Sequence, residues 1–175
     1  MSGFIRKGVT TALASLLLFL AAAAHGSDTA VERQSMAGIH ALGLFVEELQ
    51  PNVAKVAAKA GIDAASIRRE VERRLTAAGI GVVAGAGWAA LPGRPFLYIN
   101  INTHETQRFY YAYDIKVELR QVVFPEANPR ARITATTWYL SITGLTDIGN
   151  LAVIKNDTLV LVDRFTAAHR SVNPR

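Results

Sequence analysis

Two consecutive segments of the chain, residues 96–105 and 109–124, alternate between apolar and polar residues with a period of two. The apolar positions of the second segment are Tyr111, Tyr113, Ile115, Val117, Leu119 and Val123. This period is typical of a strand with one buried face and one solvated face. We therefore predict two antiparallel strands joined through residues 106–108, and a sheet that keeps one open polar face.

The pairing of these strands and the strand that follows them can also be predicted. With Asn102 paired to Ala112, Asn100 lies opposite Asp114. A third long strand is expected over residues 130–143, which are rich in threonine and aromatic side chains. Thr134, Thr136 and Trp138 of this strand share one side and are placed on the open face.

Two helices are expected. Residues 63–78 carry apolar side chains at helical spacing, with Asp63 or Ser66 as the cap and Gly79 as the stop. A second helix follows a loop over residues 144–149 and extends to Asn173. The arginines and glutamates of the first helix form a charge run that we interpret as a solvated face.

The order of elements predicts the fold class. Apolar strands at 38–49 and 80–84 flank the first helix, so they are expected to run parallel through a right-handed crossover. The full order is β-α-β-β-β-β-α. We predict an α+β, two-layer sandwich, with one mixed, mostly antiparallel sheet of about five strands and two helices on one face. Residues 51–62 are a connection with at most one helical turn, and residues 85–93 form a loop.

The N-terminal 26 residues have the three parts of a secretory signal peptide. Two basic residues are followed by an uncharged apolar run over residues 9–24, and Ala24-His25-Gly26 then provides a small-x-small site before Ser27. Cleavage after Ala24 is the alternative position, and an uncleaved membrane anchor is the alternative reading of the whole segment. We expect removal of residues 1–26, periplasmic localisation and a single mature domain over residues 27–175.

The composition excludes several kinds of chemistry. The chain has no cysteine, so it can have no disulfide, thiolate metal site or cysteine nucleophile. His40, His104 and His169 lack metal-ligand spacing, and no nucleophile-elbow motif occurs. We expect neither a metal nor a cofactor. The formal net charge of +5 includes two basic residues of the signal, so it does not indicate a nucleic-acid partner.

The open face of the sheet is the predicted binding face. Its candidate residues are Tyr98, Asn100, Asn102, Asp114, Lys116, Arg120, Thr136 and Trp138. The favoured hypothesis is a non-enzymatic binding or envelope-assembly module, with another envelope protein or a second copy as the partner. The alternative is a cofactor-free periplasmic enzyme with a site near Asn100, His104 and Asp114, which requires these three side chains to meet in one pocket.

Several segments together resemble small uncharacterised exported proteins of proteobacteria. They are Leu44-Phe-Val-Glu-Glu-Leu49, residues 67–80, Pro95-Phe-Leu-Tyr-Ile-Asn-Ile-Asn102, residues 113–122, Ala135-Thr-Thr-Trp138, Val162-Asp-Arg-Phe165 and Asn173-Pro174. The resemblance implies export and an α+β fold, and it implies no activity. At the level of fold, the element order is also similar to envelope modules such as the amino-terminal domain of TolB-like proteins and CsgG-like proteins.

Overall fold

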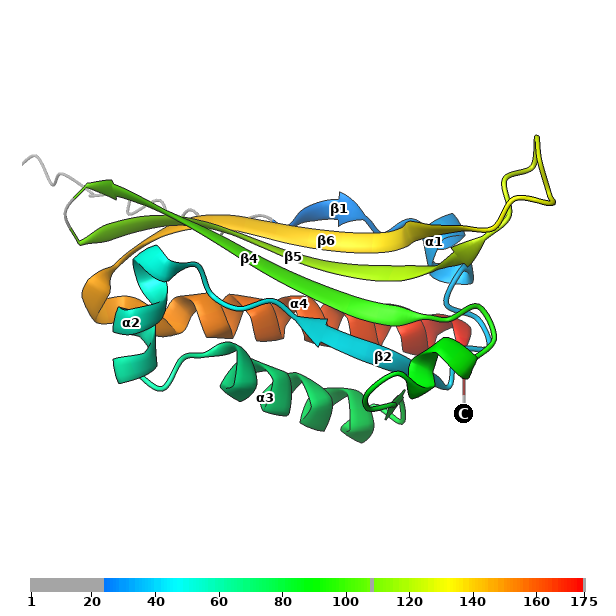
Figure 1. Ribbon diagram of the computed structural model, residues 1–175, viewed down its shortest axis with the longest axis horizontal. Coiled ribbons are helices and arrows are strands. Elements are labelled where there is room, and N and C mark those ends of the chain that lie inside the picture. Colours follow the sequence, from blue (N-terminus) through cyan, green and yellow to red (C-terminus); the bar gives the residue numbers. More distant parts are fainter. Residues whose placement is uncertain (1–23, 108, 175) are drawn as a thin grey trace, which may run out of the picture.

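The computed structural model describes residues 24–107 and 109–174 and shows one open, mixed sheet with helices packed against it (Figure 1). The strands are β1 (His25–Ser27), β2 (Ala41–Val46), β3 (Gly81–Val82), β4 (Phe96–Gln107), β5 (Tyr110–Val123) and β6 (Ile133–Asp147). Their spatial order is β1-β6-β5-β4-β2-β3. The α+β class is confirmed, with six strands and four α-helices in the described residues instead of about five and two.

The long helices form the second layer of the molecule. The helices are α1 (Ala30–Gln34), α2 (Pro51–Lys59), α3 (Ala64–Ala77) and α4 (Ala152–Val172), and two short 3₁₀ turns lie at Gly87–Ala90 and Ile148–Asn150. α3 and α4 run side by side under the sheet (Figure 1). α3 begins where the sequence predicts, because Asp63 accepts a hydrogen bond from the Ser66 backbone N–H at 2.6 Å.

The parallel part of the sheet follows the predicted crossover. β2 is parallel to β3, with Ala41 opposite Gly81, and it is also parallel to β4. The predicted strand over 38–49 is shorter, since β2 ends at Val46. The predicted connection over 51–62 contains all of α2, which begins with Pro51 and buries Val53 and Ala57.

The antiparallel hairpin is confirmed, but its predicted register is wrong by two residues. Asn102 lies opposite Asp114, and Asn100 lies opposite Lys116. β4 continues to Gln107, which pairs with Tyr110, so the turn lies further along the chain than residues 106–108. Because the shift is an even number, every side chain keeps its predicted face.

The third long strand contains a bulge that the sequence analysis missed. Leu119 of β5 lies opposite Trp138, whereas the next residue, Arg120, lies opposite Thr136. Thr137 is therefore the extra residue of a β-bulge, and the alternation along β6 reverses there. The placement of Trp138 on the open face is wrong: its side chain is fully buried and packs on Phe165 of α4, at 5.2 Å between ring centroids.

The buried indole also fastens the N-terminal segment. Trp138 Nε1 donates to Asp28 at 2.8 Å, and the Arg33 guanidinium makes two hydrogen bonds to the same carboxylate at 2.7 and 2.8 Å. The bonds from Arg33 and Trp138 outweigh burial and hold the pKa of Asp28 below its usual range. These contacts order β1 and α1, although no helix or strand was expected in residues 27–37, and residues 25 and 26 were expected to leave with the signal.

Tyr113 fixes how the end of β6 approaches α4. Its ring lies across Gly144, the opposite residue in β6, where a Cβ atom would collide with the phenol. Its hydroxyl donates to Asp157 of α4 at 2.6 Å. Burial is the largest cause of its raised pKa, followed by the Asp157 carboxylate. Gly144 is therefore required by packing.

Replacement of Gly144 by valine tests this contact. The added side chain has to displace the Tyr113 ring, and we expect a loss of about 1–3 kcal/mol in the free energy of unfolding. Urea denaturation monitored by circular dichroism measures it. The matched control is Leu145→Val, because Leu145 is 64% exposed and its replacement should change stability by less than about 0.5 kcal/mol. Equal stability of the wild-type protein and Gly144→Val would contradict this account.

Candidate functional site

The face of the sheet opposite α3 and α4 carries seven of the eight predicted binding residues. They are Tyr98, Asn100, Asn102, Asp114, Lys116, Arg120 and Thr136. Each alternates along its strand with buried residues of the opposite face, such as Leu97, Ile99 and Val117. Among the residues that the structure describes, no long helix covers this face. Trp138 is the exception explained above.

Glu118 lies at the centre of this face and was not among the predicted binding residues. Only 5% of its side chain is exposed, and one carboxylate oxygen accepts from Lys116 Nζ at 2.8 Å. The other oxygen accepts from Arg120, whose Nε lies at 2.7 Å. Burial alone would raise the pKa of Glu118, but the hydrogen bonds and charges of Lys116 and Arg120 leave it lowered. The carboxylate therefore remains charged while it is almost fully enclosed.

Two tyrosine rings support the cations that surround Glu118. Lys116 Nζ lies 4.8 Å from the centroid of the Tyr139 ring, and the Arg120 guanidinium lies 4.1 Å from that of Tyr98. Both separations are within the range of cation–π attraction. Tyr139 reaches this face because of the bulge at Thr137. A signal for it was present: polar residues occupy even positions at Thr134 and Thr136 and odd positions from Tyr139 to Thr143.

A second polar row runs along β4. Tyr98 and Asn100 both donate to the carboxylate of Glu47, which follows β2. Asn102 donates to the Asn100 side chain and accepts from Gln50 at 3.2 Å. Glu47 was not among the predicted binding residues. Here it orients two side chains of the open face, so this row is held in one arrangement.

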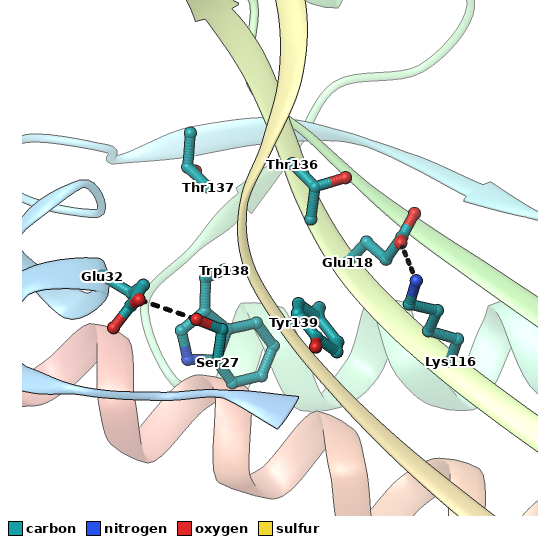
Figure 2. Close-up of a pocket in the computed structure, with 8 residues that line it drawn as sticks. All are labelled: Ser27, Glu32, Lys116, Glu118, Thr136, Thr137, Trp138 and Tyr139. Carbon is teal, nitrogen blue, oxygen red and sulfur yellow. Dashed lines mark hydrogen bonds and ion pairs between the residues drawn. The ribbon is translucent and has the colours of Figure 1, made fainter. Parts of the chain in front are cut away.

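A pocket borders the Glu118 cluster, which consists of Glu118, Lys116, Arg120, Tyr98 and Tyr139 (Figure 2). Its volume is about 320 Å³. Ser27 and Glu32 form one wall, and the Ser27 hydroxyl donates to Glu32 at 2.7 Å. On the other side, Lys116 points toward Glu118, and Tyr139 lies beside them. The pocket thus offers hydroxyl, carboxylate and ammonium groups to a polar ligand.

The second pocket tests the enzyme alternative. Asn102, His104 and Asp114 line a space of about 380 Å³, but Asn100 is not among its lining residues. Asn100 donates to Glu47, and Asp114 accepts from Thr143 at 2.8 Å. Within residues 24–107 and 109–174, no hydrogen bond joins any two of Asn100, His104 and Asp114. The structure does not assemble the constellation that this alternative requires.

An aromatic cluster extends the open face to the parallel edge of the sheet. Phe45, Trp88 and Phe96 have ring centroids 5.0–5.5 Å apart. Trp88 can lie flat against β2 because the position below it is Gly43, where a Cβ atom would come within 2.8 Å of the indole. Phe45 remains 39% exposed.

In the described part of the chain, no cluster of three or more histidine, aspartate and glutamate side chains could hold a metal ion. None of the helices in residues 24–107 and 109–174 is long and apolar enough to cross a bilayer.

No protein-family model and no curated protein sequence matches this chain. The resemblance to exported proteobacterial proteins therefore stays a prediction.

Replacement of Glu118 by glutamine tests the central ion pairs. We expect the variant to be less stable at pH 7 by about 1–3 kcal/mol, because Lys116 and Arg120 lose their counter-charge while staying partly exposed. The folded-state pKa of Glu118 is lowered. The carboxylate therefore stabilises the fold fully above the unfolded-state pKa of 4.5, and this stabilisation is lost as the pH falls through the folded-state pKa. Urea denaturation from pH 7 to pH 3 measures the difference.

The control for this experiment is Glu126→Gln, at an exposed position in the connection between β5 and β6. We expect it to change stability by less than about 0.5 kcal/mol at every pH. If the loss of unfolding free energy in Glu118→Gln stayed constant down to pH 3, the charge of the carboxylate would contribute nothing to stability.

Proposed function

We propose that this protein is an exported, periplasmic binding module, without catalytic activity, whose open sheet face docks onto another envelope protein or onto a second copy of the chain. The observation that carries the proposal is the ordered state of that face. Glu118 and Glu47 hold Lys116, Arg120, Tyr98 and Asn100 in fixed positions through direct bonds.

The ordered face favours binding for an energetic reason. Association costs free energy for each flexible side chain that has to be immobilised at an interface, about 0.5–1.5 kcal/mol per side chain. On this face, the cations and amides are already immobilised by neighbours within the sheet. The aromatic cluster of Phe45, Trp88 and Phe96 adds an apolar contact area beside them. Polar and aromatic groups together are typical of protein interfaces.

The export part of the proposal depends on the N-terminal sequence pattern. A basic start, an apolar run and a small-x-small site precede the domain. The absence of cysteine also suits a chain that enters the oxidising periplasm without forming disulfides. The periplasm is therefore the compartment in which the partner is to be sought.

The experiment compares two threonine-to-arginine variants in the exported protein. Thr136 is exposed on the open face, and Thr76 is exposed at the end of α3 on the opposite layer. Arginine at position 136 adds a bulky charge to the face, so we expect at least a tenfold weaker complex, whereas Thr76→Arg should leave association unchanged. Native mass spectrometry of protein purified from the periplasm measures the complex.

Two results would contradict the proposal. A processed chain that is always a bare monomer would contradict the binding part of the proposal and leave the periplasmic location intact. A complex that survives Thr136→Arg as well as Thr76→Arg would show that the interface lies elsewhere. Thermal unfolding of both variants excludes loss of fold as the cause, since both positions are exposed and should tolerate arginine.

A further inference from the structure

The edge of the sheet at β2 carries an arginine without an acidic partner. The Arg68 guanidinium, which comes from α3, donates to the backbone carbonyl oxygen of Leu44 at 2.5 Å. No carboxylate of residues 24–107 and 109–174 lies within ion-pair distance of it. Arg68 is only partly exposed. The other described arginines that lack an ion pair are all exposed, and these are Arg69, Arg94, Arg130, Arg132, Arg164 and Arg170.

β3 leaves this edge of β2 without a neighbouring strand beyond Leu42. The pairing of β2 with β3 covers only Ala41 and Leu42, and Val83 N–H makes a further bond to the Leu42 carbonyl oxygen at 2.9 Å. Two residues along β2, the Leu44 carbonyl oxygen accepts from Arg68 instead of from a strand. A ligand that approaches Leu44 therefore meets a guanidinium beside a strand edge.

A pocket of about 210 Å³ lies between Arg68 and the aromatic cluster of the open face. Phe45 and Trp88 of that cluster, with 5.5 Å between their ring centroids, form its second wall. A Cβ atom at Gly85, another lining residue, would meet no atom within 4 Å, so the pocket has open space there. The pocket thus has one cationic wall and one aromatic wall.

These two walls fit one class of ligand. A guanidinium has five N–H donors and pairs with a carboxylate through two parallel bonds, and Leu44 accepts only one bond from Arg68. We propose that this pocket binds a carboxylate joined to an apolar group, with the carboxylate on Arg68 and the apolar group against Trp88 and Phe45. A cationic ligand would be repelled by the unpaired charge of Arg68.

The size of the pocket limits how much of a ligand it encloses. Pockets that enclose a whole drug-sized molecule have about 300–1,000 Å³. This one is smaller, so it takes an end group: the C-terminal residue of a polypeptide or a small free acid. The proposal does not depend on docking through the Glu118 cluster, because no residue of that cluster lines this pocket.

Two ligands that differ in charge test the site. N-acetyl-L-phenylalanine has a carboxylate and a phenyl group, and N-acetyl-L-phenylalaninamide lacks the charge. The chain has two tryptophans, and Trp138 is fully buried elsewhere, so NMR of the indole N–H groups reports on Trp88 separately. With the protein purified after expression of residues 1–175, we expect the acid to shift the Trp88 signal with a Kd of about 1 mM, a value suited to so small a ligand.

The amide should bind at least tenfold more weakly than the acid, and neither ligand should shift the Trp138 signal. Equal binding of acid and amide would overturn the proposal. So would the absence of any Trp88 shift at an acid concentration of about 10 mM, tenfold above the expected Kd.

Arg68→Gln and its matched control Arg69→Gln test the guanidinium. Glutamine removes the charge of Arg68 and keeps an amide donor, so we expect at least tenfold weaker binding of the acid and unchanged binding of the amide. Arg69 is exposed and does not line the pocket, so Arg69→Gln should bind the acid like the wild-type protein. Equal affinity of the two variants for the acid would overturn the proposal. If Arg68→Gln does not fold, the comparison of acid and amide on the wild-type protein still decides.

A third ligand distinguishes the two sources of the carboxylate. 3-Phenylpropionate has the same phenyl group and carboxylate but lacks the acetylated backbone nitrogen. If N-acetyl-L-phenylalanine binds at least tenfold more tightly, the site takes the C-terminal residue of a polypeptide, whose backbone uses the strand edge at Leu44. Equal binding of these two acids assigns the pocket to small free acids. Both results support the carboxylate site.

Discussion

The bulge at Thr137 is the constraint on which the arrangement of this molecule depends. It reverses the alternation of β6, so that Trp138 enters the core while Thr136 and Tyr139 both face outward. Without the extra residue, either the indole would leave α4 or the tyrosine would leave the Glu118 cluster. One residue in one strand therefore connects the packing of the helix layer with the composition of the open face.

Electrostatic pairing on the open face is internal to the protein. The carboxylates of Glu118 and Glu47 are engaged by neighbouring side chains, and both cations of the central cluster have a carboxylate and an aromatic ring as neighbours. If this face binds a partner, as proposed, recognition depends less on net charge than on fitted hydrogen bonds and aromatic contact. This distinguishes it from the basic surfaces of nucleic-acid-binding sheets.

Strongly periodic segments were predictable from the sequence, and irregular ones were not. The alternation of β5 and the cap at Asp63 identified their elements because each depends on neighbouring residues. The ordering of β1 depends on contacts between distant segments, for which one sequence carries little local signal. The bulge at Thr137 does leave a local signal, the change of polar residues from even to odd positions, but regular alternation was expected there. The open face was predictable as a face, but Glu118 was left out of the candidate binding residues, Tyr139 was missed, and Trp138 was placed on the wrong side.

The bond between Trp138 and Asp28 joins residues 110 positions apart. The N-terminal segment is the first part of the domain to leave the ribosome, yet its partners in β6 are made near the end of synthesis. β1 therefore remains unpaired until β6 has been synthesised, and the edge of the sheet that contains β1 can form only after that. Contacts of such long sequence separation slow folding, because the long intervening loop must be closed before they can form.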